Sequence, residues 1–265
     1  MEHIRPLKRF GQNYLADDNI LRKIADEINP KKDDLLIEIG PGFGALTKFL
    51  IEKVDNLIAI EIDERVIESL LAKFPGLHLI TRDILDFDIE KLSKDEKSKV
   101  RVAGNIPYNL TSPILFKLIE NTNYVNDAVL MIQYEVAQRI NAKRGTKDYG
   151  ILAVLMQYFA DVEFCFKVSP NVFYPKPKVF SAVIHLRFKN CDLLPEEKIY
   201  FIKVVKAAFG NRRKTLKNSL SNSIFGNLNF EGCGIDLSLR AEQLTIDNFL
   251  MLTKFTYEKS RFNDN

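Results

Sequence analysis

One stretch of the sequence decides the fold: LLIEIGPGFGA, Leu35–Ala45. An apolar run of strand length ends abruptly at glycines, and a helical pattern follows over Leu46–Val54. Glycines at such a place let the backbone pass close to a ligand, and the N-terminus of the helix that they open favours polar or anionic groups. The stretch therefore predicts the start of a nucleotide-binding βαβ unit, with Gly40 and Gly42 beneath the ligand.

An acidic residue completes this pattern. Glu61 ends the next apolar run, Leu57–Glu61, about 20 residues beyond the glycines, where a carboxylate can hold the two ribose hydroxyls of an adenosine. Together these features predict an adenosine-containing cofactor without identifying it. The spacing Gly40-x-Gly42-x-x-Ala45 also fits the dinucleotide fingerprint, so an NAD-linked oxidoreductase is a rival interpretation.

Further apolar runs alternate with helical patterns. Strands are expected at Leu77–Ile80, Val100–Ala103 and Ala128–Ile132. The alternation predicts an α/β fold with a mainly parallel, doubly wound, Rossmann-like sheet. Five helices are expected beside these strands. The first begins after a cap at Asp17 or Asp18, and the fourth begins after a cap at Ser112, with Pro113 at its first position. The others are Leu46–Val54, Val66–Phe74 after a cap at Asp63, and Tyr134–Ala142.

The pattern changes after residue 150. Ile151–Phe159 is apolar enough for a buried helix, and Val162–Val168 and Val179–Phe188 indicate two strands joined by a proline-rich turn, which favours an antiparallel edge of the sheet. Beyond about residue 191 the signals are helical. We therefore expect a cofactor-binding catalytic domain at 1–190 and a small helical domain at 191–265.

The totals exclude several classes of protein. A chain of 265 residues with 46% hydrophobic and 28% charged residues is ordinary for a folded protein. No run approaches the ~18 apolar residues of a membrane span, and the N-terminus has no apolar signal core. Cys165, Cys191 and Cys233 form no C-x-x-C pair, which argues against disulfides or a zinc-thiolate site and suits a reducing cytosol. The three histidines show no metal-ligand spacing, so we expect a cytoplasmic protein without a metal.

The strongest chemical signal is the turn Asn105-Ile106-Pro107-Tyr108, which follows the strand at Val100–Ala103. The Asn105 side-chain oxygen can accept a hydrogen bond from an exocyclic amine, and Tyr108 offers a flat face for a nucleobase. Pro107 has no N–H that could compete as a donor. The alternative is that this turn has no role in binding and is an ordinary strand end with a proline turn.

A second carboxylate follows the third strand. Asp83 can accept a hydrogen bond from an adenine amine while Ile84 lies against the ring; a turn cap by Asp83 is the alternative. Because ligands of open α/β sheets bind where strand order reverses, we expect Gly40, Glu61, Asp83 and Asn105 to converge in one crevice.

Two further stretches indicate RNA. FYPKPK, Phe173–Lys178, joins a rigid proline turn to aromatics and lysines, so Phe173 is expected to wall an extruded base; core packing is the alternative. Seven basic residues and no acidic residue lie between positions 198 and 217. With the basic arm Arg5, Lys8 and Arg9, this run is typical of a phosphate-binding surface, with a solvated helix face as the alternative. The expected RNA contacts are Lys206, Arg212, Arg213, Lys214 and Lys217.

In combination, these motifs resemble one family closely: the ribosomal RNA small-subunit adenine N6,N6-dimethyltransferases of the KsgA type. The resemblance runs over most of the chain. It is carried by the segments 10–15 (FGQNYL), 38–42 (EIGPG), 105–109 (NIPYN), 133–139 (QYEVAQR), 147–150 (KDYG), 173–179 (FYPKPKV) and 212–216 (RRKTL).

The resemblance implies a class I methyltransferase fold that uses S-adenosyl-L-methionine. It implies dimethylation of two neighbouring adenines near the 3′ end of small-subunit ribosomal RNA, with the assembling small subunit as partner. Nothing in the sequence demands more than a monomer, so we expect a monomeric enzyme. The resemblance also implies a role for each site residue. Around the cofactor, Gln12, Asn13 and Leu15 form a flap over the methionine part, Gly40 and Gly42 lie beneath it, Glu61 binds the ribose, Asp83 and Ile84 contact the adenine, and Asn105 touches the cofactor. Around the substrate, Asn105 and the Ile106 carbonyl accept from the target amine, and Tyr108 and Phe173 lie on either side of the flipped base.

Other interpretations stay open at this stage. The macrolide-resistance methyltransferases share the Asn-Ile-Pro-Tyr turn but act on large-subunit RNA. A non-catalytic RNA-binding assembly factor could keep the same fold. Two departures from the bacterial small-subunit pattern are Ile106, where Leu is frequent, and Tyr14, where Phe is frequent.

Overall fold

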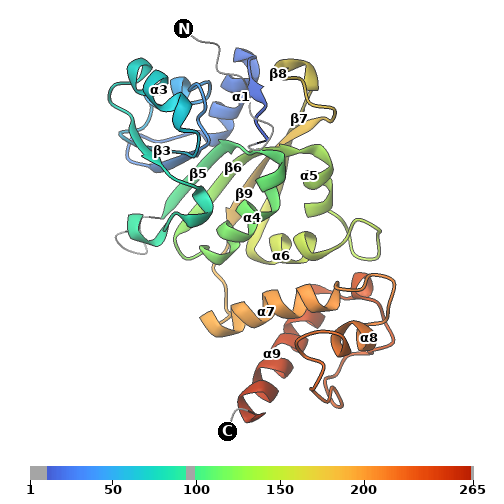
Figure 1. Cartoon of the computed structure of the whole chain (residues 1–265). Coiled ribbons are helices and arrows are strands. Elements are labelled where there is room, and N and C mark those ends of the chain that lie inside the picture. The colour runs from blue at the N-terminus through green and yellow to red at the C-terminus, as the bar shows by residue number, and fades with distance from the viewer. Residues whose placement is uncertain (1–10, 94–98, 264–265) are drawn as a thin grey trace. The chain divides into compact units, whose positions relative to one another are not determined.

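The computed structural model of the chain describes residues 11–93 and 99–263 (Figure 1). Across its main sheet the strands are, in order, β4 (His78–Thr81), β3 (Asn56–Glu61), β2 (Leu35–Ile39), β5 (Val100–Asn105), β6 (Val125–Gln133), β9 (Ser181–Phe188) and β7 (Ala160–Val168). The strands β4 to β6 in this order pair in parallel, and β9 pairs antiparallel with both β6 and β7. The predicted α/β fold with an antiparallel edge is confirmed.

Strand order reverses beside β2. The chain proceeds outward from β2 to β3 and β4, and then returns to β5 on the other side of β2. Connections that leave in opposite directions open a crevice at the carboxyl ends of the strands. Gly40 directly follows β2, and Asn105 ends β5, so both lie at this reversal, as predicted.

The helices follow the expected order, with differences at their ends. Asp17 caps α1 through hydrogen bonds from Asn19 N (2.9 Å) and Ile20 N (3.1 Å). The cap predicted at Ser112 is wrong, because the turn Tyr108–Leu110 runs directly into α4 at Thr111. The helix bounds are α1 Asp18–Ile28, α2 Thr47–Leu50, α3 Ile67–Lys73, α4 Thr111–Glu120, α5 Tyr134–Ile140, α6 Ile151–Phe159, α7 Pro195–Ala208, α8 Leu216–Ser221 and α9 Ile246–Asn263.

A small second sheet was not predicted. It pairs β1 (Tyr14–Leu15) antiparallel with β8 (Phe173–Tyr174), with Leu15 opposite Phe173. Strands of two residues carry no periodicity, so only the fold reveals them. The pairing ties the segment before α1 to the proline-rich segment, and both side chains of the Leu15–Phe173 pair enter the hydrophobic core.

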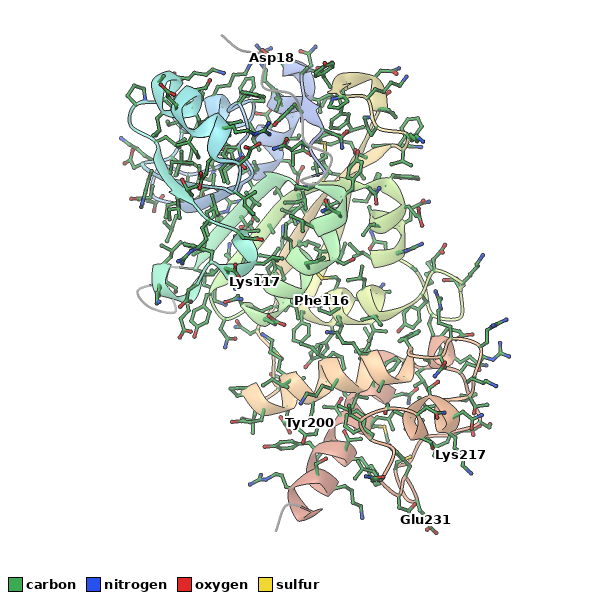
Figure 2. The ribbon with its side chains drawn as sticks, in the orientation of Figure 1. Asp18, Phe116, Lys117, Tyr200, Lys217 and Glu231 are labelled. Atoms are coloured by element: carbon green, nitrogen blue, oxygen red, sulfur yellow. The ribbon has the colours of Figure 1, made fainter. Side chains whose placement is uncertain are left out.

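The chain divides into two compact units. One is Met1–Ala137 with Ala160–Asn190, and the other is Gln138–Phe159 with Cys191–Asn265. The second unit therefore takes in α6, which the expected boundary at 190 had left in the first domain. Its core is rich in aromatic rings; Tyr200, labelled in Figure 2, meets Tyr257 edge-to-face with ring centroids 5.2 Å apart. Within the described part of the chain, no helix is long and apolar enough to cross a membrane.

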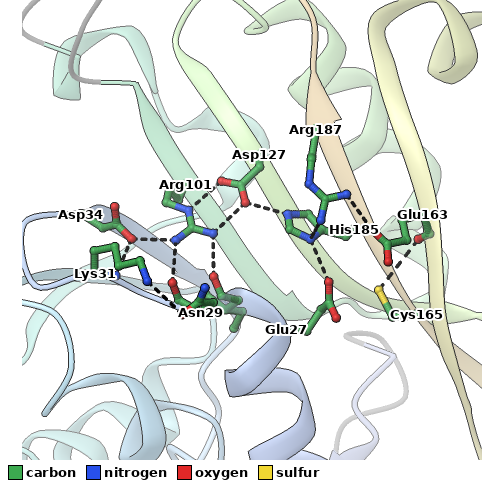
Figure 3. Close-up of polar contacts among 11 residues, drawn as sticks. Glu27, Asn29, Lys31, Asp34, Arg101, Asp127, Glu163, Cys165, His185 and Arg187 are labelled. Carbon is green, nitrogen blue, oxygen red and sulfur yellow. Dashed lines mark hydrogen bonds and ion pairs between the residues drawn. The ribbon is translucent and has the colours of Figure 1, made fainter.

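A polar network joins the strands of the first unit near the start of β5 and β6 (Figure 3). Asp127 accepts from Arg101 Nε at 2.7 Å and faces His185 Nε2 at 2.7 Å. His185 Nδ1 in turn lies 2.9 Å from both Glu27 Oε1 and Arg187 Nη2. Because a guanidinium already reaches this cluster of acids and imidazole, we assign the network a structural role: it fastens α1 to β5, β6 and β9.

Candidate cofactor and substrate site

A pocket of about 290 Å³ opens at the carboxyl ends of β2, β3 and β5 in the first unit. It brings together most of the predicted site residues from segments far apart in the sequence. Its lining includes Gln12, Asn13, Gly40, Gly42, Glu61, Asp83, Ile84, Asn105, Ile106, Pro107 and Tyr108. Several other lining residues had no predicted site role, among them Gly11, Tyr14, Ile62, Arg82, Asn109 and Ile114.

The glycine loop forms the floor of this pocket in a conformation that requires glycine. Gly40 and Gly42 have φ angles of 64° and 56°, in the left-handed region. A Cβ at Gly42 would lie 2.8 Å from Tyr14 Cε1, whereas a Cβ at Gly40 would meet nothing within 4 Å. The space above Gly40 is therefore open to a ligand that approaches the backbone closely.

Glu61 is held rigidly at the end of β3. Its Oε2 accepts from Gly42 N at 3.0 Å, and its Oε1 accepts from the N–H groups of Ile62 and Asp63, each at 2.9 Å. Burial raises the pKa of Glu61 above its ordinary value, although these backbone donors oppose the shift. A carboxylate has about four acceptor sites, so Glu61 keeps capacity for a ligand hydroxyl.

The segment before β1 is fastened over the pocket by its side chains and backbone. Gln12 Nε2 donates to Asp63 Oδ2 at 2.8 Å, and Asn13 O accepts from Asn105 Nδ2 at 2.8 Å. A Cβ at Gly11 would lie 2.4 Å from Asn109 Oδ1, so only glycine fits there with φ of 60°. These contacts join the predicted flap to the end of β3 and to the turn at Asn105.

The hydroxyl of Tyr14 is buried and, among the described residues, has no hydrogen-bond partner. Burial, followed by the charges of Asp63 and Glu61, raises the pKa of Tyr14 to about 12. An unsatisfied buried hydroxyl costs about 1–3 kcal/mol. A ligand that brings a hydrogen-bond acceptor into this pocket would remove that cost, so the residues fit a polar cofactor.

The turn at Asn105 presents the predicted substrate side. Asn105 Nδ2 donates to Asn13 O, which fixes the orientation of the amide, and its oxygen can act as the acceptor. Ile106 N donates to Met131 O at 3.0 Å, which fixes the backbone of the turn. Tyr108 Oη lies 2.8 Å from the buried Ser181 Oγ, so the aromatic ring is anchored through a residue that sequence reasoning missed.

Asp83 caps a turn and also lies at the pocket; its contact with an adenine amine stays a prediction. Its Oδ1 accepts from Leu85 N at 2.9 Å and caps the turn Ile84–Asp86, while the residue also lines the pocket. Ile84 beside it is buried. The capping bond orients the carboxylate and leaves Oδ2 for a ligand amine.

Leu15 and Phe173 do not line the pocket. Their side chains are 5% and 6% exposed and belong to the core between β1 and β8. The bland alternative for Phe173, core packing, describes its position in this structure. Its role beside a flipped base stays a prediction, and contact of Leu15 with the cofactor stays one too.

The predicted RNA contacts lie in the second unit and are exposed side chains of α7, α8 and the loop between them. Lys217 lies on the surface of α8 (Figure 2). Arg212 differs from its neighbours, because its guanidinium donates to the carbonyl groups of Lys147 and Tyr149 and so fastens the loop before α6. The basic arm at Arg5, Lys8 and Arg9 falls outside the described residues.

Comparison with known proteins agrees with this geometry. The profile of a family described as "Ribosomal RNA adenine dimethylase" matches residues 5–258. Proteins named ribosomal RNA small subunit methyltransferase A are similar over 252 residues, which is 94% of this chain and 96% of theirs. The one from Francisella tularensis subsp. novicida (strain U112) is 42% identical, and the one from subsp. tularensis (strain WY96-3418) is 41% identical.

Solved structures show the same fold over nearly the whole chain. A dimethyladenosine transferase from Plasmodium falciparum superposes with a TM-score of 0.74 at 25% identity, covering 93% of this chain and 98% of that one. The 23S rRNA methyltransferase ErmE superposes with a TM-score of 0.64, also at 25% identity, covering 91% and 98%.

Proposed function

Because the chain belongs to the ribosomal RNA adenine dimethylase family, we propose that it transfers methyl groups from S-adenosyl-L-methionine to N6 of two neighbouring adenines near the 3′ end of small-subunit ribosomal RNA. The product is N6,N6-dimethyladenosine. The names of the relatives at 41–42% identity support the small subunit as the substrate. Family membership leaves no basis for the NAD-linked interpretation. A cytoplasmic monomer that acts on an assembling small subunit is part of the proposal.

The pocket residues have the chemistry to hold such a cofactor. Glu61 would accept from a ribose hydroxyl of the cofactor, and Asp83 from its adenine amine. The open space above Gly40 would admit the part of the cofactor that approaches the glycine loop. Asn13 and Gln12, fastened to Asn105 and Asp63, would close over the methionine part. When bound, S-adenosyl-L-methionine supplies a methyl group made electrophilic by its sulfonium sulfur.

The turn at Asn105 would align the nucleophile. An adenine N6 amine is a poor nucleophile because its lone pair is shared with the ring. Acceptors at Asn105 Oδ1 and the Ile106 carbonyl would favour the rehybridised amine and stabilise the positive charge that develops on nitrogen. Tyr108, anchored on Ser181, would hold the base by stacking. The proton can leave to solvent, so no side chain is required as a strong base.

The observation that carries the proposal is the orientation of Asn105. Its amide nitrogen donates to Asn13 O at 2.8 Å, which fixes the amide at the edge of the pocket, and its oxygen can then accept from the target amine.

The test is methyl transfer from labelled S-adenosyl-L-methionine to small ribosomal subunits that lack adenine dimethylation, with naked large-subunit RNA as comparison. We expect label in N6,N6-dimethyladenosine of the small subunit. Label confined to large-subunit RNA would assign the chain to the resistance-type reaction. Cofactor binding without transfer to either substrate would contradict an enzymatic role.

A further inference from the structure

Four side chains form an exposed aromatic ledge in the first unit: Tyr134 at the start of α5, Phe164 and Lys167 of β7, and Phe180 just before β9. Lys167 Nζ lies 4.3 Å from the ring centroid of Tyr134 and 4.1 Å from that of Phe180. The rings of Tyr134 and Phe164 meet edge-to-face at 5.9 Å. The ledge is thus one connected group, in which the cation lies over two of the rings and the third ring contacts Tyr134.

A β-bulge creates the ledge. Residues three apart in a regular strand face opposite sides of the sheet, and Glu163 and Cys165 of β7 belong to the network on the other face (Figure 3). The register of β7 against β9 shifts between Phe164 and Phe166, so that Phe164 lies opposite Ile184 and Lys167 opposite Ala182. Ile184 and Ala182 are two apart and share a face. The bulge therefore turns Lys167 to the side of Phe164.

The remaining ring of the ledge follows from the same register. Phe180 is two residues before Ala182 and extends the same row, and its carbonyl accepts from Tyr134 N at 2.9 Å. This bond fixes the start of α5 beside the end of β9; Figure 1 shows α5, β7 and β9 in the same part of the unit.

Two aromatic side chains of the ledge are exposed to solvent. The side chains of Phe164 and Phe180 are 41% and 45% exposed. Exposed rings beside lysines are the surface that unpaired nucleotides bind, because every base has a face for stacking and every phosphate a negative charge. Lys176 and Lys178, both exposed, add positive charge in the neighbouring loop, while the nearby acid Glu163 is already paired with Arg187 at 2.6 Å.

The ledge lies at the same end of the sheet as the substrate side of the pocket. Phe180 immediately precedes Ser181, whose hydroxyl lies 2.8 Å from Tyr108 Oη on the opposite face of the sheet. A nucleotide on the ledge would therefore lie at the strand end that also anchors Tyr108. We propose that the aromatic ledge binds an unpaired nucleotide that flanks the target adenine, by stacking on Phe180 and Phe164, with Lys167 beside its phosphate. This inference rests on the proposed function and names a further contact with the same RNA.

The first test is kinetic. Phe180→Ala and Phe164→Ala should each raise the KM for small ribosomal subunits lacking dimethylation about 5- to 100-fold, as loss of one stacked base does. The affinity for S-adenosyl-L-methionine should stay unchanged. Leu71→Ala removes an exposed apolar side chain (39%) on α3 and serves as the matched control with unchanged KM. Wild-type KM in both ledge variants would overturn the inference.

A crosslinking test identifies the occupant. With p-benzoyl-phenylalanine in place of Phe180, irradiation with the same subunits should give an RNA crosslink within a few nucleotides of the dimethylated adenines. A crosslink to a ribosomal protein, or to a second copy of the chain, would overturn the inference and assign the ledge to protein docking. If wild-type enzyme methylates no subunit at all, the proposed function fails; normal methylation without either ledge effect defeats the ledge alone.

Discussion

The side-chain amide of Asn105 donates to the backbone carbonyl of Asn13 across 2.8 Å, although the two residues are 92 positions apart in the chain. This bond joins the turn that ends β5 to the segment before β1, and both line the pocket. It also fixes the orientation of the amide, whose oxygen is its only acceptor. Under the proposed function, one side chain would therefore couple cofactor binding to alignment of the target amine.

The buried hydroxyl of Tyr14 gives a prediction in which stability and affinity move in opposite directions. Tyr14→Phe removes only an unsatisfied polar group, so thermal unfolding of the ligand-free protein should occur at the same or a higher temperature. Affinity for S-adenosylhomocysteine, measured by titration calorimetry, should fall about 5- to 10-fold, or about 1 kcal/mol. Because the pKa of Tyr14 is about 12, the difference should be constant from pH 7 to 9. Equal affinities would contradict a hydrogen bond between this hydroxyl and the ligand.

Glu38 predicts an unusual dependence of stability on pH. Its side chain is 1% exposed and accepts from Thr47 Oγ1 at 2.7 Å, and burial raises its pKa to about 7. Because the pKa of this carboxyl is higher in the folded state than in the unfolded state, the unfolded state ionises first as pH rises. The free energy of unfolding should therefore fall between about pH 4.5 and pH 7. Glu38→Gln keeps an acceptor for Thr47 and should be about 3 kcal/mol more stable than wild type at pH 8.

Urea unfolding at pH 5 and pH 8 checks this prediction. The two proteins should have similar unfolding free energies at pH 5, where Glu38 is protonated in the folded state. An equal pH dependence in both proteins would mean that Glu38 is ionised without penalty.

The network around Asp127 predicts that the free energy of unfolding falls as pH is lowered, opposite to the effect of Glu38. Burial would raise the pKa of Asp127, but hydrogen bonds from Arg101 and His185 outweigh it and lower the pKa to about 2. The resulting stability, about 2 kcal/mol, is present above pH 4 and should be lost as pH falls toward 2. Asp127→Asn should cost about 3–5 kcal/mol at pH 7, since it leaves buried charges without their partner. Asp34→Asn, which breaks a more exposed contact with Arg101, is the control and should cost less in the same unfolding measurement.

The basic surface of the second unit should act through phosphates. Replacing Arg213, Lys214 and Lys217 with Ala should weaken binding to small subunits and reduce the slope of log affinity against log salt by up to about 2–3. Thermal unfolding should not change, because these side chains are exposed. Arg212→Ala, by contrast, should lower the unfolding temperature, because it removes two hydrogen bonds to the loop before α6. An unchanged salt slope would mean that these residues form a solvated helix face and do not contact phosphates.

The sequence predicted the fold well where periodicity carried the information. Apolar runs of strand length and the glycine loop placed β2, β3 and β5, and with them the pocket. It carried no signal for features that depend on contacts between distant segments: the two-residue pairing of Leu15 with Phe173, and the grouping of α6 with the second compact unit. For Phe173 it left core packing and a place beside a base open, and the side chain is buried. Ser181 as the anchor of Tyr108 had no local signal, because the two residues meet only through the β6–β9 pairing.

The measurement that tests the central claim most directly is the single-turnover rate of methyl transfer by Asn105→Ala, with cofactor and subunit affinities measured on the same protein. We predict a rate about 10²- to 10³-fold below wild type, as for loss of one group that stabilises developing charge, while subunit binding is retained. Asn105→Asp, which keeps an acceptor oxygen, should recover part of the rate. A rate for Asn105→Ala within about twofold of wild type would contradict the assignment of this amide to the target amine.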